Sequence, residues 1–325
     1  MNLPTPPLPT PDDVIAAARL LAGVAHRTPI LRSTTIDRLF GARLYFKCEN
    51  LQRTGSFKFR GAYCALAQFD EAQRERGVLA AAGDNHAQAV ALAAREHDIP
   101  ALLVMPQDTA VTTLEAARGY GAQVVTYDRA SEDPERLVQR LAADRGMRVI
   151  PAADHLQMIA GHGTATLELL QEVPRLDYLF VPVGSGALLA GSLLAVRAAR
   201  SACELFGVEP EAGEHARQSL QAGRIITVGQ PRTIADAAQA RALAPLAFEV
   251  IRAAAAPRML GASDPQLLDA LRFFAQRMKL LVEPTGALAF AGAREGGIDL
   301  HGKRVGIIVS GGNADLPRYA RFISD

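Results

Sequence analysis

The amino-acid sequence predicts an α/β protein built on parallel β-sheets, and two observations lead to this fold class. From about residue 43 onward, short apolar runs alternate with longer amphipathic segments. Strands that alternate with helices in this way form parallel sheets covered by helices on both faces. The chain has 325 residues, of which 49% are hydrophobic, so it can fill a sizeable core and is long enough for about two domains.

The first helix is expected to begin directly after Thr10. Thr10 is a favourable N-cap and Pro11 suits the first helical turn. Asp12 and Asp13 place negative charge near the positive end of the helix dipole. The Pro-rich residues 4–11 are the only low-complexity tract, and no fixed-period repeat is present.

The strands are predicted at short apolar runs separated by helical patterns. In the segment Ala87–Arg95, apolar residues follow the i, i+3, i+4, i+7 spacing of one buried helix face. The predicted strands, in chain order, are Leu44–Cys48, Val78–Ala82, Ala101–Met105, Gln123–Tyr127, Tyr178–Val183, Glu204–Val208 and Arg304–Val309.

Charge and cysteine content exclude several classes of function. Lys+Arg 35 against Asp+Glu 34 leaves a net charge of +1, with no basic run, which disfavours binding to nucleic acid or to a membrane surface. Cys48, Cys64 and Cys203 are odd in number and far apart, which argues against a disulfide framework. No apolar run reaches the ~18 residues of a membrane span, and the first residues lack a secretory leader pattern. A soluble, cytoplasmic protein is expected.

A loop of small residues, Gly184-Ser185-Gly186-Ala187, connects a predicted strand to a helical segment. Such a loop presents backbone N–H groups to an anion, and the helix dipole adds to the attraction. A tight strand–helix turn would explain the glycines equally well. The loop therefore indicates a phosphate site without naming the ligand.

A dinucleotide-binding fingerprint is the other interpretation of this loop. Gly184 and Gly186 match its first two glycines, and Glu209 lies near the position of the ribose-binding acid. The third glycine position is Leu189, where close packing of the helix on the strand requires glycine. Phosphate binding is therefore favoured over dinucleotide binding.

Lys58 is the residue whose sequence surroundings most clearly indicate a chemical role. It lies between Phe57 and Phe59, directly before a helical segment. Apolar neighbours and a helix N-terminus both disfavour the ammonium form and lower the pKa toward that of a nucleophilic amine. A lysine that forms a Schiff base needs this property.

The stretch around Lys58, TGSFKFRGA, resembles the lysine motif of the fold-type II pyridoxal-phosphate (PLP) enzymes, the family of serine/threonine dehydratases and serine racemases. Four further stretches resemble the family's motifs in the same order, and five matches in order are far more specific than one. They cover roughly residues 28–315. These stretches are Gly83–Gln88 for SSGNHAQ, Gly184–Ala187 for the tetraglycine loop, Val282–Ala287 for VEPTGA and Ser310–Asn313 for SGGN.

The resemblance implies two sheet domains of the tryptophan synthase β-like fold, with both sheets open, twisted and mostly parallel and the cofactor in the cleft between them. The large PLP-binding domain is expected to comprise residues 1–66 and 147–325, and the small domain residues 67–146. About twelve residues follow the last motif, so no C-terminal regulatory domain is expected.

The resemblance also implies a role for each matching residue. Lys58 is expected to carry PLP covalently and to act as the catalytic base, with Phe57 packed near the ring. Asn85 is expected to bind the phenolic oxygen and Ser310 to face the pyridine nitrogen. The remaining expected cofactor-binding residues are Gly184, Ser185, Gly186, Ala187 and Glu283, and the expected substrate-binding residues are Ser56, Ala82, Gly83, Asp84, Asn85 and His86.

The sequence departs from the family at several of these positions. Two serines of the SSGNH motif are replaced by Ala82 and Gly83, and its glycine is replaced by Asp84. The second serine is the acid/base opposite the lysine in the racemases, so its loss predicts dehydration without racemisation. The family's cation site would use Glu209 and a second acid, but the second position is His215, a poor ligand for Mg²⁺ or Ca²⁺. A divalent cation is therefore left open, with Glu209 as a weak candidate ligand.

The predicted function is a PLP-dependent ammonia-lyase of the L-threonine or L-serine class, which releases a 2-oxo acid and ammonia. The alternatives are a related lyase for another substrate such as 3-hydroxyaspartate, or a PLP-binding homologue with little catalysis. The expected partner is a small amino-acid substrate, with no nucleic acid or membrane, and a homodimer is expected because symmetric dimers are the commonest oligomers.

Overall fold

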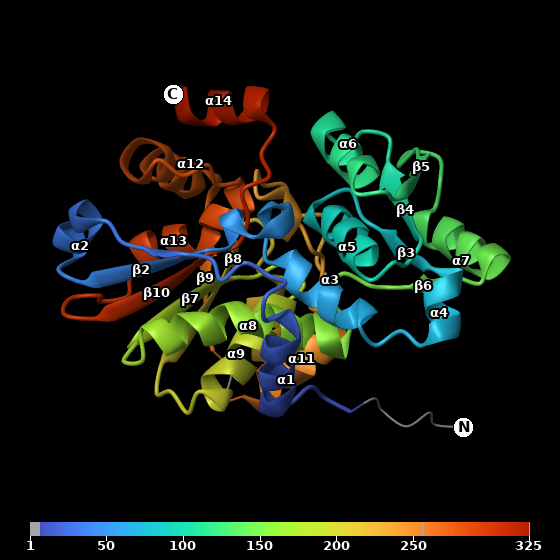
Figure 1. The fold of residues 1–325 in the computed structure, drawn as a ribbon. Coiled ribbons are helices and arrows are strands. Elements are labelled where there is room, and N and C mark those ends of the chain that lie inside the picture. Colours follow the sequence, from blue (N-terminus) through green and yellow to red (C-terminus); the bar gives the residue numbers. More distant parts are fainter. Residues whose placement is uncertain (1–6, 255–256, 325) are drawn as a thin grey trace.

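The computed structural model describes residues 7–254 and 257–324, and its larger sheet has six strands in the order β1-β2-β10-β7-β8-β9. All neighbouring strands are parallel except the short β1, which pairs antiparallel with β2. The central strands are buried on both faces (Figure 1). The strand bounds are β1 Ile30–Leu31, β2 Arg43–Cys48, β10 Arg304–Val309, β7 Tyr178–Pro182, β8 Glu204–Pro210 and β9 Arg258–Ala262.

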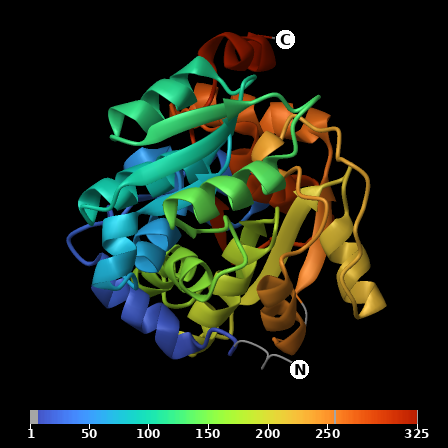
Figure 2. The same ribbon diagram turned by 90° about the vertical axis from the view of Figure 1, so that its right-hand side faces the viewer.

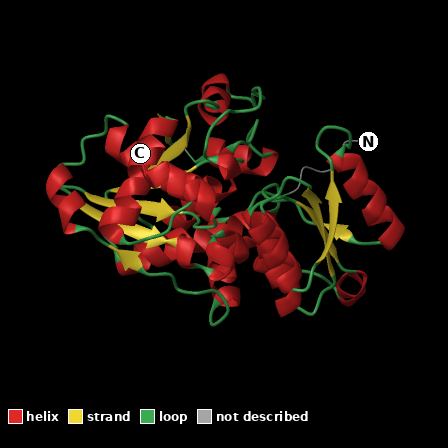
Figure 3. Ribbon diagram, turned by 90° about the horizontal axis from the view of Figure 1, so that it is seen from above, coloured by secondary structure: helices red, strands yellow, loops and turns green. Residues whose placement is uncertain are grey.

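The smaller sheet has four parallel strands in the order β5-β4-β3-β6. The two groups of strands lie apart, with helices between and around them (Figure 3). In Figure 2 the teal and green segment that contains the smaller sheet gathers on one side of the molecule. The strand bounds are β5 Gln123–Tyr127, β4 Ala101–Pro106, β3 Val78–Ala81 and β6 Arg148–Val149.

Helices cover both faces of each sheet, as the alternating pattern predicts. On the larger sheet, α8 and α9 pack on one face and α13 on the other. On the smaller sheet, α5 and α6 lie against one face and α7 against the other. The helix bounds are α1 Pro11–Leu21, α2 Thr34–Phe40, α3 Lys58–Leu66, α4 Glu71–Arg76, α5 Asn85–Glu96, α6 Val111–Gly119, α7 Pro134–Arg145, α8 Leu156–Glu172, α9 Ala187–Ala198, α10 His215–Ala222, α11 Pro245–Ala253, α12 Asp264–Phe273, α13 Pro284–Glu295 and α14 Leu316–Ser324.

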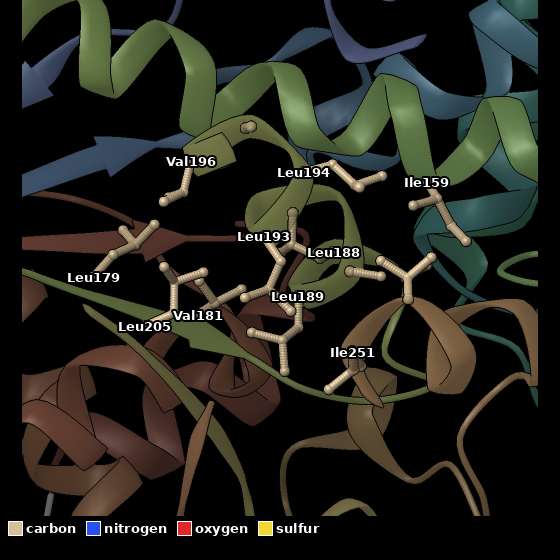
Figure 4. Packing of buried hydrophobic residues seen from close by; sticks show 14 of the residues in the cluster. Ile159, Leu179, Val181, Leu188, Leu189, Leu193, Leu194, Val196, Leu205 and Ile251 are labelled. Carbon is tan, nitrogen blue, oxygen red and sulfur yellow. The ribbon is translucent and has the colours of Figure 1, made fainter. Parts of the chain in front are cut away.

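The core under α8 and α9 is formed mainly by aliphatic side chains. Leu179, Val181 and Leu205 on the sheet pack against Leu189 and Leu193 of α9 (Figure 4). Each fully buried side chain of this kind stabilises the fold by about 1.5–3 kcal/mol relative to exposure. This packing holds the start of α9, and therefore the loop before it, against the sheet.

The predicted first helix and strands agree closely with the structure. Thr10 is the N-cap of α1, and it forms a capping box with Asp13. Each predicted strand is present within two residues of its predicted bounds. Residues 4–6 of the Pro-rich tract lie outside the described residues.

Three strands were not predicted, because β1 and β6 are two residues long and β9 is a mixed, half-buried segment. β6 pairs with β3 of the smaller sheet although it lies after the predicted domain boundary at residues 146/147. We therefore propose that the small domain extends to Val149. Among the described residues, no helix is long and apolar enough to cross a membrane.

Candidate active site

The turn that carries Lys58 is tied to the end of β10. Ser56 forms an isolated β-bridge with Gly311, and the Phe57 N–H donates to the Ser310 carbonyl oxygen at 3.1 Å. Helix α3 then begins at Lys58 itself. Two segments that are about 250 residues apart in the chain are thus held together by backbone hydrogen bonds.

The Lys58 side chain lies in a largely desolvated environment. Its Nζ is 3.4 Å from the Ala152 carbonyl oxygen and 5.3 Å from the centre of the Phe57 ring. Burial lowers the pKa of Lys58, and the negative charges of Asp84 and Glu283 oppose this shift only in part. The neutral, nucleophilic amine is therefore favoured relative to an ordinary lysine.

The chain has only four lysines, and their environments differ sharply. Lys47 is fully buried, and its ammonium donates to Glu168 and to the Thr28 carbonyl oxygen. Lys279 is exposed, and Lys303 lies over the ring of Tyr178 at the opposite end of the sheet. Lys58 has a lowered pKa and lines the cavity at the carboxyl ends of β7 and β10.

The loop 184–187 follows β7 and opens α9. Gly186 has φ = 91°, a left-handed conformation that favours glycine, and a β-carbon there would lie 2.7 Å from Leu243 Cδ2. The Ser185 carbonyl oxygen accepts a hydrogen bond from the Ala244 N–H. The loop therefore has the backbone geometry of an anion-binding turn at a helix N-terminus.

Packing below this loop disfavours the dinucleotide-binding alternative. Leu189 is fully buried in the core beneath α9, where a dinucleotide fingerprint would need glycine. The space for its side chain comes from Gly207 on β8, where a β-carbon would lie 3.0 Å from Leu189 Cδ2. The Leu189 side chain therefore sets the spacing between α9 and the sheet at this contact.

Asn85 and Glu283 are joined across the two halves of the molecule. The Asn85 side-chain N–H donates to Glu283 Oε1 at 2.7 Å, and the Asn313 amide donates to Asn85 Oδ1 at 2.7 Å. Burial, together with the charges of Asp236 and Asp84, raises the pKa of Glu283 to about 8. The Glu283 carboxyl is therefore largely neutral at pH 7.

A cavity lies between these elements at the carboxyl ends of β7 and β10, where parallel sheets bind their ligands. A second hollow, at the amino ends of β7 and β8, lies on the edge of the sheet that does not carry ligand sites. All residues predicted to bind the cofactor line the first cavity, namely Phe57, Lys58, Asn85, Gly184, Ser185, Gly186, Ala187, Glu283 and Ser310.

The residues predicted to bind substrate are more dispersed. Ser56 is fully buried within the turn that carries Lys58. Asp84 caps α5, because its Oδ1 accepts the His86 N–H at 2.9 Å. The His86 ring lies 3.3 Å from the Ile150 carbonyl oxygen, and burial lowers its pKa to about 4, so it is neutral at pH 7.

Ala82 and Gly83 form the half-buried loop between β3 and α5. A β-carbon on Gly83 would lie 2.8 Å from the Thr109 hydroxyl and 2.9 Å from Pro106 Cδ. Thr109 is buried, and its hydroxyl has no partner among the described residues. The loop therefore lacks a side chain at position 83, and a neighbouring threonine fills that space.

Sequence reasoning missed several contacts in the site. Thr285 lines the cavity, and its hydroxyl accepts the Ala237 N–H at 3.1 Å. Its place in the stretch Val282–Ala287 was a signal that could have identified it. The Ala152 carbonyl next to Lys58 carries no sequence signal, because any residue supplies one.

His162 packs edge-on against Phe57, with ring centres 4.7 Å apart. Burial, followed by the charges of Lys58 and other neighbours, holds the pKa of His162 well below its ordinary value. The neutral ring of His162 therefore packs against a residue of the cavity wall.

Comparison with known proteins identifies the family. Residues 21–311 match the family model described as "Pyridoxal-phosphate dependent enzyme". The chain is 50% identical to L-threo-3-hydroxyaspartate ammonia-lyase of Pseudomonas sp over 311 residues, which cover 96% of this chain and 97% of the relative. It is 48% identical to serine racemase of Schizosaccharomyces pombe over 317 residues, 98% of each chain. The solved structure of a threonine deaminase from T.th. has a TM-score of 0.88 at 40% identity and covers 94% of this chain and 99% of its own. The chain therefore belongs to the family of pyridoxal-phosphate dependent enzymes.

Proposed function

We propose that this PLP-dependent enzyme is an ammonia-lyase that dehydrates a small L-β-hydroxy amino acid of the L-threonine or L-serine class. The observation that carries the proposal is the single cavity that combines Lys58, the loop 184–187, Asn85 and Ser310. Two of the three relatives described above are named as ammonia-lyase or deaminase, and the third as a racemase of a hydroxy amino acid.

The residues of the cavity fit the cofactor at each of its polar groups. The loop 184–187 offers backbone N–H groups for a phosphate, and Gly186 adopts the left-handed conformation that this turn requires. Asn85 is suited to bind the phenolic oxygen, and Ser310 at the end of β10 is suited to face the ring nitrogen. Phe57 forms part of the wall beside the Lys58 amine. The cofactor would supply the electron sink for the reaction.

Lys58 would then act as the base on its own side of the site. Its neutral amine removes the α-proton of the substrate, and the β-hydroxyl departs as water. The enamine that leaves the enzyme hydrolyses to a 2-oxo acid and ammonia. The surrounding desolvation favours this role, because it lowers the pKa of Lys58.

Neutral groups near Ser310 favour elimination over competing reactions. The Ser310 hydroxyl carries no charge, and the raised pKa of Glu283 leaves this carboxyl of the cavity lining largely protonated at pH 7. With no anion to hold a proton on the ring nitrogen, the electron sink is weaker, and prompt loss of the hydroxyl is favoured.

The charges around the cavity affect which substrate side chain is favoured. Asp84 and Asp236 are exposed carboxylates close enough to Glu283 to raise its pKa. A second carboxylate on the substrate would be repelled by these groups, which favours the neutral side chains of serine and threonine. L-threo-3-hydroxyaspartate is the second candidate, because a relative 50% identical to this chain is named for that activity.

Ammonia release from L-serine, L-threonine and L-threo-3-hydroxyaspartate tests the proposal directly. We expect a higher kcat/KM for one of the two neutral substrates. A preference for 3-hydroxyaspartate would support the second candidate. No release from any of the three would favour a PLP-binding homologue with little catalysis.

The substitution Ser310→Asp is expected to lower kcat for elimination by about tenfold or more and to increase transamination. A carboxylate at this position would hold a proton on the ring nitrogen and strengthen the electron sink. The measurement is kcat together with the amount of substrate transaminated per turnover. Ser310→Ala is the matched control, because it removes the hydroxyl without adding charge. If Ser310→Asp turns over like the native protein, Ser310 does not face the ring.

No racemase activity is expected with L-serine. Racemisation needs an acid/base group on each face of the substrate, and Lys58 supplies only one. On the opposite face, Gly83 has no side chain, and Asp84 is engaged as the cap of α5. The test is to incubate L-serine in deuterated water and separate the enantiomers by chiral chromatography.

The appearance of deuterated D-serine would contradict this prediction, and two variants would then locate the second base. Loss of D-serine in Asp84→Asn would assign that role to Asp84. Loss of D-serine in Thr109→Val would assign it to the buried hydroxyl next to Gly83. Both variants keep the size of the original side chain.

We further propose that the protein acts in the cytoplasm as a homodimer. Cys48, Cys64 and Cys203 are all free and buried, as expected of a chain that folds in a reducing compartment. Symmetric dimers are the commonest oligomers of soluble proteins. Light scattering of the purified protein would test the oligomeric state.

A further inference from the structure

His215 connects the candidate cation ligand Glu209 to the loop 184–187. It is buried at the first position of α10, and its Nε2 lies 2.8 Å from the Gly184 carbonyl oxygen. Its Nδ1 lies 3.4 Å from Glu209 Oε2 at the end of β8. The imidazole thus lies between the end of β8 and the loop 184–187 at the carboxyl edge of the larger sheet.

Protein donors already occupy both oxygens of the Glu209 carboxyl. Oε2 accepts the Ala216 N–H and Oε1 accepts the Arg217 N–H, both at 2.9 Å. These N–H groups belong to the first turn of α10, where a carboxylate is favoured by the helix dipole. Glu209 is fully buried, so no bulk solvent competes with these contacts.

The surroundings of Glu209 do not fit a divalent cation. Mg²⁺ and Ca²⁺ require about six or more oxygen ligands, and the side chain nearest to Glu209 Oε2 offers nitrogen. Glu214, the neighbouring acid, is half-exposed and pairs with Arg217 at 2.8 Å. Within the described part of the chain, no group of three or more His, Cys, Asp or Glu side chains is arranged to hold a metal ion.

One ring hydrogen of His215 follows from its hydrogen-bond partner. The Gly184 carbonyl can only accept, so Nε2 must carry a hydrogen. Nδ1 lies 3.4 Å from Glu209 Oε2 and forms no hydrogen bond within the described part of the chain. The buried imidazole therefore holds the Gly184 carbonyl by a hydrogen bond and contacts Glu209 with its other ring nitrogen.

Fixing the Gly184 carbonyl also fixes the anion-binding loop. The carbonyl of Gly184 and the N–H of Ser185 belong to one planar trans peptide, so they point in opposite directions and turn together. The Ser185 carbonyl is held in the same way by the Ala244 N–H, which sets the direction of the Gly186 N–H. The directions of the Ser185 and Gly186 N–H groups are thus set by the hydrogen bonds that the Gly184 and Ser185 carbonyls accept.

We infer that His215 is a positioning residue for the cofactor's phosphate loop, and that it makes retention of the cofactor independent of a divalent cation. This inference rests on the proposed placement of the phosphate at the loop 184–187. The His215 imidazole binds the Gly184 carbonyl by a hydrogen bond from the start of α10 and contacts Glu209 with its other nitrogen. The loop then keeps its N–H groups directed at the phosphate without a metal ion below it.

The test is the rate at which the holoenzyme releases PLP, measured in EDTA and again with Mg²⁺ or Ca²⁺. The native protein is expected to release PLP at the same rate under all three conditions. In His215→Leu the rate should rise about tenfold or more, because the buried hydrogen bond to the Gly184 carbonyl is lost and that carbonyl loses its partner. Neither ion should restore it. In His215→Asp, PLP should be released rapidly in EDTA and retained again with Ca²⁺, since two facing carboxylates attract the cation.

Three further variants keep the result interpretable. His97 also bonds a backbone carbonyl, that of Tyr63, but far from the loop, so His97→Leu should leave PLP release unchanged. His215→Gln can still donate to Gly184 and should recover most of the retention lost in His215→Leu. Ser185→Asp should expel PLP by placing a carboxylate in the loop. If Ser185→Asp retains PLP normally, the phosphate lies elsewhere and the proposed placement fails, whatever His215 does.

Two results would overturn the inference itself. One is a native protein that loses PLP in EDTA and regains it with Mg²⁺ or Ca²⁺. The other is a folded His215→Leu variant, with unchanged far-ultraviolet circular dichroism, that releases PLP at the native rate. Both readouts measure cofactor binding rather than turnover, so they are independent of which amino acid the enzyme dehydrates.

Discussion

Lys58→Ala is expected to abolish covalent attachment of the cofactor and to lower elimination by at least about ten-thousand-fold. The amine at this position has a lowered pKa and lies in the lining of the cavity. Borohydride treatment of the native protein should fix PLP on the peptide that contains Lys58, and mass spectrometry should find no such label in the variant. The fold should remain intact, because the amine that alanine removes is one whose charged form is already disfavoured by burial.

Lys303→Ala is the matched control for this prediction. Lys303 lies over the Tyr178 ring at the amino end of the larger sheet, away from the cavity. Its loss should leave both the label and the activity unchanged. A label on Lys47, Lys279 or Lys303 in the native protein would contradict the assignment of Lys58.

The fold was predictable because most of its strands are short, strongly apolar and bounded by polar turns. Gln123–Tyr127 and Arg304–Val309 coincide with their predicted bounds, and Thr10 caps α1 as expected. Strand β9 was missed because Arg258–Ala262 is only half-buried and lies at an edge of the sheet. Its pairing with β8 is decided by tertiary contacts, which local sequence does not encode.

The site was predictable where a residue type carries the chemistry, as with Lys58 between two phenylalanines. It was not predictable where a contact depends on the path of the backbone. The carbonyls of Ala152 and Gly184 illustrate this limit, because every residue has a carbonyl and only the fold directs these two toward Lys58 and His215. The hydroxyl of Thr109 next to Gly83 likewise depends on how the β3 and β4 loops meet.

Four charged side chains form a buried cluster, namely Lys47, Glu49, Arg60 and Glu168. Arg60 is fully buried two residues after Lys58, and it donates to both oxygens of Glu49 and both oxygens of Glu168. Lys47 supplies the second positive charge, so the cluster is neutral as a whole. It joins β2, α3 and α8, and α3 begins at Lys58.

Arg60→Met is expected to lower the free energy of unfolding by about 3–5 kcal/mol, because it leaves the Glu49 carboxylate buried without its charge partner. For a chain of this length, that loss corresponds to a fall of roughly 4–7 °C in Tm. Thermal unfolding of the holoenzyme, followed by circular dichroism, measures the change. Arg53→Met is the matched control, since Arg53 pairs with Glu96 at a partly exposed site (side-chain exposures of 21% and 29%). Its loss should cost about 1 kcal/mol or less.

The pH dependence separates a lost charge partner from a simple loss of packing at Arg60. Burial alone would raise the pKa of Glu49, but Arg60 outweighs it and holds that pKa below its ordinary value. This lowered pKa stabilises the native fold above the ordinary pKa, and the stabilisation is lost as the pH falls through the lowered value. Without Arg60, burial would raise the pKa of Glu49, so the folded variant would gain stability as the pH falls toward the ordinary value of about 4.3. The Tm difference between the native protein and Arg60→Met should therefore narrow between about pH 7 and pH 4.5. A difference that stays constant over this range would mean that the variant loses packing rather than the charge partner of Glu49.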